Sequence, residues 1–180
     1  IVVDAAHPLF LYLPCCVGGA PGGITFGAKQ LWGDYVHCFF VEPTQAPCML
    51  LGLMTGRHNQ VSVQDIGLSG KTCADGLAVG TPSSFVGRFI APMVSGCVTV
   101  EDRKLFDYLR DVLDTEGTFL EPSAAAGVQG LLDLCGNLAM KQYWNRYGLR
   151  QHAANSTHII WATGGKLVPE KARAEYLSKC

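Results

Sequence analysis

A glycine-rich stretch near the start of the chain carries the residues with the clearest chemistry. Leu13 to Ile24 reads LPCCVGGAPGGI. Small residues let the backbone approach a ligand closely, and the N–H groups of a first helical turn have no partner within the helix, so they favour an anion. Pro21 suits a first-turn position because its missing N–H is not needed there. The stretch therefore predicts a cradle for an anion, most often a phosphate.

Two other interpretations of this stretch stay open. A tight strand-to-helix turn would need the glycines for packing alone. A dinucleotide fingerprint, GxGxxG, needs glycine at the third position of the window from Gly18 to Gly23, where this chain has Ala20, although Glu42, about twenty residues on, suits a ribose contact. A Walker loop is excluded, because no Gly-Lys-Ser/Thr follows.

Two other positions offer oxygen ligands at the ends of predicted strands. Thr163 precedes Gly164 and Gly165, and glycines at a strand end permit close approach to its hydroxyl. Glu42, with the carbonyls of the turn over 44–48, offers the hard oxygens that cations prefer. None of the five histidines has a partner at ligand spacing, so we expect them to be structural or exposed.

The elements that position these residues follow from hydrophobic periodicity. The apolar run from Pro8 to Leu13 predicts a buried strand, the stretch from about Gly22 to Leu31 a helix, and Tyr35 to Glu42 a second strand. Strand, helix and strand at this spacing form a βαβ unit, whose ligands collect at the carboxyl ends of the strands. We therefore expect an α/β fold, a Rossmann-like parallel sheet with helices on both faces.

The rest of the chain continues this alternation. The pattern predicts helices over 48–54, 85–94, 101–116, 125–138 and 169–177, strands over 97–100 and 157–163, a long excursion over 55–84 and a polar-aromatic segment over 140–150. A loop as long as the excursion is often functional.

Composition limits the class of protein. The 180 residues carry a net charge of −1 and are 48% hydrophobic, which gives no electrostatic reason to expect nucleic acid or an anionic membrane as a partner. No apolar run approaches the roughly 20 residues of a membrane span, so we expect a cytoplasmic setting. The eight cysteines include no C-x-x-C pair, which favours buried or partly buried free thiols over disulfides or metal ligands.

Ten short motifs together resemble the D-serine dehydratases, a branch of the fold-type II pyridoxal-phosphate enzymes. They are LPC at 13–15, VGG at 17–19, PGG at 21–23, VHC at 36–38, EPT at 42–44, PCMLLG at 47–52, SVQDIG at 62–67, ADGLAVG at 74–80, EPSA at 121–124 and WATGG at 161–165. Because they follow one collinear order over nearly the whole chain, the resemblance is more specific than a single glycine loop. It implies a tryptophan synthase β-like fold and pyridoxal 5'-phosphate as cofactor.

The resemblance also implies which residues contact that cofactor. Backbone N–H groups hold the phosphate, and a hydroxyl faces the pyridine nitrogen. These residues are Cys16, Val17, Gly18, Gly19 and Gly22 for the phosphate and Thr163 for the nitrogen. A hydroxyl at that place leaves the pyridine largely unprotonated, which suits β-elimination over transamination. Cys16 and Ala20 depart from the family, which usually has glycine at both positions.

A cation site is implied at Glu42 and the carbonyl of Ala46. Related enzymes can carry an aspartate where this chain has Cys48, which argues against a divalent ion and leaves a monovalent one such as potassium.

The implied reaction is the β-elimination of D-serine to pyruvate and ammonia. The resemblance implies D-threonine as a second substrate. The family's Schiff-base lysine lies in an N-terminal region that does not match any part of these residues, and Lys29 and Lys166 are not in its motif. We therefore expect residues 1–180 to be the C-terminal portion of a dehydratase, mostly the large cofactor-binding domain. Such a portion would contain no catalytic residue, would need the N-terminal portion, and would be inactive alone. The competing interpretation is a non-catalytic or dinucleotide-binding Rossmann-like module.

Overall fold

The computed structural model, which describes residues 1–179, contains a four-stranded parallel sheet. Its strands are β1 (Leu9–Pro14), β2 (Val36–Pro43), β3 (Gly96–Val100) and β4 (Thr157–Ile160), in the order β3-β2-β1-β4. All three neighbouring pairs are parallel. The predicted α/β class with a parallel sheet is confirmed.

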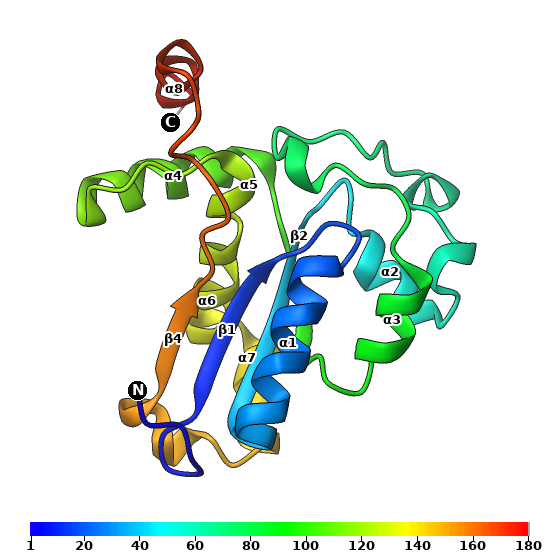
Figure 1. Ribbon diagram of the computed structural model, residues 1–180, viewed down its shortest axis with the longest axis vertical. Coiled ribbons are helices and arrows are strands. Elements are labelled where there is room, and N and C mark those ends of the chain that lie inside the picture. Colours follow the sequence, from blue (N-terminus) through cyan, green and yellow to red (C-terminus); the bar gives the residue numbers. More distant parts are fainter. Residues whose placement is uncertain (180) are drawn as a thin grey trace.

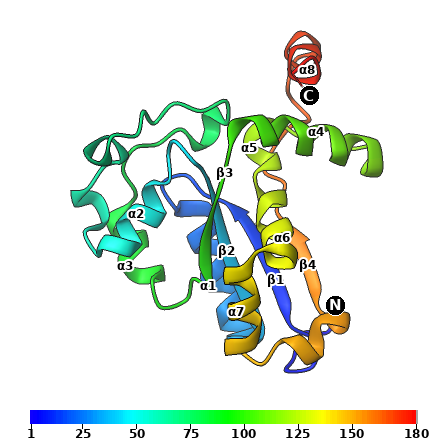
Figure 2. The ribbon, with the colours of Figure 1, turned by 180° about the vertical axis from the view of Figure 1, so that it is seen from behind.

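Helices cover both faces of this sheet (Figures 1 and 2). They are α1 (Gly19–Trp32), α2 (Cys48–Thr55), α3 (Ser84–Ile90), α4 (Asp102–Glu116), α5 (Pro122–Ala125), α6 (Gly127–Gly136), α7 (Leu138–Arg146) and α8 (Glu170–Leu177). Helix α1 lies on the face seen in Figure 1, and α6 and α7 lie on the face seen in Figure 2. The excursion over 55–84 contains only short 3-10 turns.

The central strand β1 shows why its sequence is a continuous apolar run. Leu9, Leu11 and Leu13 pack into a cluster with residues of α1 and α2, while Phe10 and Tyr12 pack into a second cluster with Leu134 of α6. Successive side chains of a strand point to opposite faces, and in this sheet both faces are buried.

Several predicted elements have other bounds in the structure. Helix α1 begins at Gly19 rather than near Gly22, because Gly18 takes a left-handed conformation that ends the preceding loop. The polar-aromatic segment is largely the helix α7, which Asn137 caps by accepting a hydrogen bond from the N–H of Ala139 at 2.9 Å. The same cap ends the helix before it at Gly136. Strand β4 ends at Ile160, so Thr163 lies in the loop beyond it.

The cysteines in the described part of the chain are unpaired. Six are buried or half-buried, as predicted, whereas Cys135 near the end of α6 is exposed. Cys180 lies outside the described residues. Within residues 1–179, no helix is both long and apolar enough to span a membrane.

Candidate functional site

The loops that follow β1, β2 and β4 meet at one edge of the sheet, which is uppermost in Figure 1. Because the strands are parallel, their carboxyl ends lie at the same edge. This arrangement places the glycine-rich loop, Glu42 and the segment containing Thr163 on one side of the molecule, as the sequence predicted.

Gly18 is required by the shape of the glycine-rich loop. Its φ angle is +102°, a value that side-chain-bearing residues rarely adopt. A Cβ atom at this position would lie 2.2 Å from Cε of Met49 and 3.0 Å from Cγ1 of Val86, and one at Gly22 would lie 2.7 Å from the same Val86 atom. Side chains of α2 and α3 therefore fill the space under the loop, and its backbone is held at the surface.

The backbone N–H groups of this loop are available to a ligand. Gly22 donates to the carbonyl of Gly18 at 2.8 Å, and Pro21 has no N–H. In the described part of the chain, the N–H groups from Cys16 to Ala20 have no hydrogen-bond partner. Unpaired N–H groups at a helix N-terminus attract an anion. The loop therefore fits a phosphate without any charged side chain.

Neighbouring elements fix the loop from both ends. The N–H of Cys15 donates to the carbonyl of Val41 at 2.8 Å, and the N–H of Ser83 donates to the carbonyl of Val17 at 3.0 Å. The first bond ties the loop to β2, and the second ties it to the start of α3. A loop that is held in this way can keep its free N–H groups oriented before a ligand arrives.

Glu42 is fully buried and caps α2. The N–H groups of Met49 and Leu50 donate to its two carboxyl oxygens at 2.7 and 2.8 Å. Burial raises the pKa of Glu42 to about 7, although these hydrogen bonds lower it. Because Glu42 holds the first turn of α2, it also places Met49 beneath Gly18. Sequence reasoning missed this capping role, since nothing in the motif indicates where the carboxylate points.

The predicted cation ligands Glu42 and Ala46 lie in one buried turn. The carbonyl of Ala46 accepts a hydrogen bond from the N–H of Cys48 at 3.0 Å, and both carboxyl oxygens of Glu42 already accept bonds from backbone amides. Among residues 1–179, no group of three or more His, Cys, Asp or Glu side chains could hold a metal ion. A cation at this turn would rest on backbone carbonyls as well as on Glu42, and it stays a prediction.

Thr163 lies in an exposed loop with its hydroxyl unpartnered in the described residues. The next position requires glycine, because a Cβ at Gly164 would lie 2.3 Å from a carboxyl oxygen of Glu121. Gly165 has a φ of +143°, and a Cβ added at this position would lie 2.3 Å from the carbonyl oxygen of Phe119. The two glycines thus let the segment run directly against the start of α5.

Arg173 of α8 holds this segment from the other side. Its guanidinium donates to the carbonyls of Val168, Lys166 and Gly165 at 2.9, 2.7 and 3.3 Å, and it lies 4.8 Å from the centre of the Phe119 ring. A cavity of about 520 Å³ opens beside it, lined in part by Asp75, Glu121 and Tyr176. No local sequence pattern indicates the role of Arg173, because its partners are backbone carbonyls.

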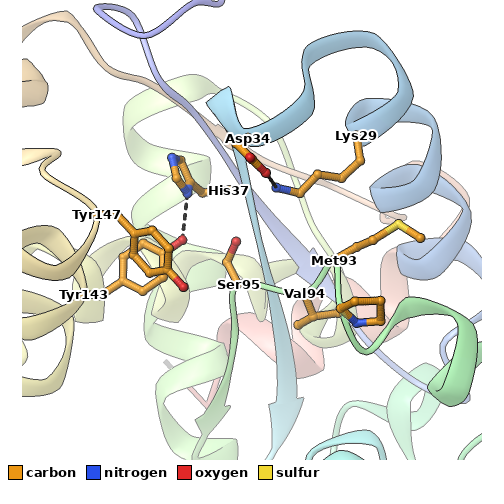
Figure 3. Close-up of a pocket in the computed structure, with 9 residues that line it drawn as sticks. Lys29, Asp34, His37, Met93, Val94, Ser95, Tyr143 and Tyr147 are labelled. Carbon is orange, nitrogen blue, oxygen red and sulfur yellow. Dashed lines mark hydrogen bonds and ion pairs between the residues drawn. The ribbon is translucent and has the colours of Figure 1, made fainter.

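A second concave site lies at the amino ends of the strands (Figure 3). This cavity of about 250 Å³ brings together Lys29, His37, Ser95, Tyr143 and Tyr147. His37 shares a 2.7 Å hydrogen bond with the Tyr143 hydroxyl, Lys29 donates to the carbonyl of Val36 at 2.8 Å, and Ser95 accepts from the N–H of Cys38 at 3.0 Å.

These polar groups mostly serve the fold. Burial, with a further contribution from the Lys29 charge, lowers the pKa of His37 to about 4. The Nε2 atom of His37 is buried and has no hydrogen-bond partner among residues 1–179. A neutral, enclosed imidazole and the bonded hydroxyls of Tyr143 and Ser95 leave little for a substrate to use besides the Tyr147 hydroxyl, which has no partner among the described residues. The residues that the sequence singled out are therefore at the opposite edge from this cavity.

The chain is similar to known proteins along most of its length. Residues 2–143 match the family described as "Pyridoxal-phosphate dependent enzyme". A probable D-serine dehydratase of Geobacillus stearothermophilus is 56% identical over 176 residues, which are 98% of this chain and 38% of that protein. A probable D-serine dehydratase of Bacillus mycoides is 54% identical over 179 residues, 99% of this chain and 40% of that protein. The chain thus spans about 40% of the length of these curated relatives.

Solved structures show the same fold at low sequence identity. Maize serine racemase superposes with a TM-score of 0.70 at 19% identity, covering 96% of this chain and 48% of that one. The processed threonine deaminase isoform 2 of Solanum lycopersicum gives a TM-score of 0.67 at 23% identity, covering 97% of this chain and 42% of that one.

Proposed function

The chain belongs to the pyridoxal-phosphate-dependent enzyme family, and from that premise we propose that it forms part of the cofactor-binding domain of a D-serine dehydratase. The observation that carries this proposal is the loop at the end of β1. It presents five consecutive backbone N–H groups, at Cys16 to Ala20, that have no partner within residues 1–179, over a floor that a Cβ at Gly18 would fill. The names of the relatives supply the substrate, D-serine.

The residues of this chain bind and orient the cofactor. The N–H groups of Cys16, Val17, Gly18 and Gly19, with the turn through Gly22, hold the phosphate by their dipoles and not by side-chain charge. The free hydroxyl of Thr163 would contact the pyridine nitrogen of pyridoxal phosphate and would not force protonation on it. Pyridoxal phosphate, when bound, supplies an electron sink for charge that develops at the substrate α-carbon.

The lysine that anchors the cofactor comes, in this proposal, from outside these 180 residues. Lys29 is committed to the carbonyl of Val36 at the amino edge, far along the sheet from the cradle. Lys166 lies in an exposed turn, and its backbone carbonyl accepts a hydrogen bond from the guanidinium of Arg173. The protein is then a dehydratase only when its remaining portion is present, and we propose that these residues alone form no pyruvate.

We further propose that a monovalent cation such as potassium binds near Glu42 and the carbonyl of Ala46. Its role would be to stabilise the turn between β2 and α2, and through Met49 the floor of the cradle. Removal of potassium would then weaken cofactor binding and leave the strands intact.

The test uses a graft, in which these 180 residues replace the matching region of the Geobacillus stearothermophilus relative. We expect the graft to bind pyridoxal phosphate and not NAD, and to release pyruvate from D-serine, with D-threonine as a weaker substrate. The chain alone should form no pyruvate. A graft that folds but binds NAD in place of pyridoxal phosphate would favour the dinucleotide-binding alternative and overturn the proposal.

A further inference from the structure

An apolar groove runs along α1 where that helix crosses the sheet. It encloses about 310 Å³, and every residue that lines it is apolar. Its floor is formed by Leu9 and Leu11 of β1 with Ile159 of β4, and its walls include Ile24, Leu31 and Trp161. The rim is strongly exposed, since 73% of Leu31 and 40% of Trp161 are accessible to water. Contiguous apolar surface of this kind marks a site where another element packs.

The wall that α1 contributes is shaped for a close neighbour. Gly23 and Gly27, one turn apart, both line the groove, and a Cβ at either position would meet no atom within 4 Å. Glycine costs stability in a helix interior, and nothing inside the described residues requires it at these two places. Two glycines on one face do allow a second helix to approach α1 closely.

The outer strand β4, beside the groove, is covered by a helix on one face only. Helix α6 packs against β1, β2 and β4 on the far side, whereas Figure 1 shows β4 without a helix in front of it. A parallel sheet normally has both faces covered. The edge of β4 is open as well: Thr157 and Trp161 donate their N–H groups toward β1, so the alternate N–H groups of His158 and Ile160 face away from the sheet.

We propose that this groove is the docking surface for an amphipathic helix from the part of the parent polypeptide that lies outside these 180 residues. The inference rests on the proposed function, which makes the chain part of a longer dehydratase. Relatives that match it over 98–99% of its length are themselves covered to only 38–40%, so each has ample chain to supply the helix. No charged side chain lines the groove, so the occupant needs an apolar face.

The test places a charge in the groove without disturbing the chain that forms it. Gly27→Glu replaces an exposed helical glycine by a better helix former, so the chain alone should keep or raise its melting temperature. In the graft, the carboxylate would have to be buried under the docked helix. We expect the melting temperature of the graft without cofactor to fall by about 3 °C or more.

Gly136→Glu is the matched control. Gly136 is also helical, exposed and free of neighbours within 4 Å, and it belongs to α6 on the other face of the sheet. This variant should leave the melting temperature of the graft unchanged. An equal effect of both variants, or no effect of Gly27→Glu on the graft, would overturn the proposal.

Hydrogen exchange gives a second measurement, which does not require the isolated 180 residues to fold by themselves. In the graft, amides over 23–32 and 157–161 should exchange about tenfold more slowly than in the Gly27→Glu graft, and amides over 127–136 should exchange alike in both. If the protection instead depends on protein concentration, a second copy occupies the groove and the proposal is wrong. Both readouts are taken without cofactor, so a graft that makes no pyruvate would contradict the proposed function without affecting this comparison.

Discussion

The two edges of the sheet offer opposite kinds of binding chemistry. At the amino edge, Lys29, His37 and Tyr143 converge on a cavity, but their polar atoms are largely bonded to one another or to the backbone (Figure 3). At the carboxyl edge, the loop from Cys16 to Ala20 has no charged side chain, and its five N–H groups have no partner in the part of the chain that the structure describes. Unsatisfied backbone donors, more than a density of titratable side chains, therefore favour a site for an anionic cofactor.

The cost of changing each edge should differ in the same way. A site built from backbone depends on small residues and on the helices under it, so substitutions that add atoms should damage it most. A site built from bonded side chains contributes mainly to stability, so substitutions that remove its polar atoms should change unfolding and leave cofactor affinity alone.

Gly18→Asp is expected to have the largest effect. A side chain at Gly18 meets Met49 and Val86, and the new carboxylate would repel the phosphate. We expect cofactor affinity in the graft to fall by about a hundredfold or more, since two effects of about 1–3 kcal/mol each act together. Titration with pyridoxal phosphate, followed by its visible absorbance, measures this loss.

Gly148→Asp is the control for that variant at the amino edge. Gly148 also has a positive φ, +65°, and a Cβ there would meet no atom within 4 Å. It lines a cavity next to His37, so the same charge is added beside the other site. If Gly148→Asp weakened cofactor binding as much as Gly18→Asp, the assignment of the cradle to the carboxyl edge would be wrong.

The pH dependence of stability should report His37. Its pKa is about 4 in the folded protein, against 6.5 for an unperturbed histidine, so the unfolded chain takes up a proton first as the pH falls. The stability is therefore full above about pH 6.5 and is lost toward about pH 4, with a loss of about 2 kcal/mol between about pH 7 and about pH 5. Lys29 strengthens this shift and Asp34 opposes it.

Replacement by Phe isolates the contribution of that imidazole. Phe10 already stacks on the ring of His37 at 4.9 Å, so His37→Phe keeps an aromatic contact and removes the titration. Urea unfolding at both pH values should show a smaller loss in the variant than in the unchanged chain. The lowered pKa of His158 adds a loss that is common to both proteins. An equal total loss in the two would show that His37 has the same pKa in the folded and the unfolded chain, which would contradict the prediction.

The sequence predicted the carboxyl edge better than the amino edge, for physical reasons. The βαβ unit around the loop after Leu13 is visible because apolar runs and glycines act locally. The amino-edge cavity was not predicted, since it joins His37 to Tyr143 across more than a hundred residues and no local pattern marks such a contact. The helix that carries Tyr143 was likewise missed, although Met140, Tyr143, Trp144 and Tyr147 recur at helical spacing.

At the carboxyl edge, the motifs predicted which residues lie there but not which side chains hold them in place. Thr163 and the glycines after it were identified by their spacing, whereas the guanidinium that holds their segment comes from α8. Glu42 was selected as a ligand, yet its carboxylate caps α2 in the structure. The direction of a side chain depends on which backbone amides surround it, and that is settled only by tertiary packing.

Arg173→Lys should show that such a support matters for the cofactor. Lysine keeps the charge but cannot make the forked contacts to three carbonyls, so the turn after Thr163 should loosen. We expect cofactor affinity in the graft to fall about fivefold, with an absorbance maximum that shifts because Thr163 is displaced. Arg110→Lys is the control, since Arg110 also donates to a backbone carbonyl, that of Leu177 at 2.8 Å. If both variants lowered cofactor affinity equally, Arg173 would contribute only to general stability and would have no specific role in placing Thr163.

Tyr143→Phe is expected to have the smallest effect and to be confined to unfolding. The change removes the hydroxyl that bonds His37 and keeps the ring that packs edge-on against Phe39 at 5.1 Å. We expect the free energy of unfolding to fall by about 1 kcal/mol and the affinity for pyridoxal phosphate to stay the same. Tyr147→Phe, which removes a hydroxyl without a hydrogen-bond partner in the described residues, should change neither quantity. Weaker cofactor binding in Tyr143→Phe alone would mean that the amino edge is coupled to the cradle through β2, because β2 carries His37 at one end and Glu42 near the other.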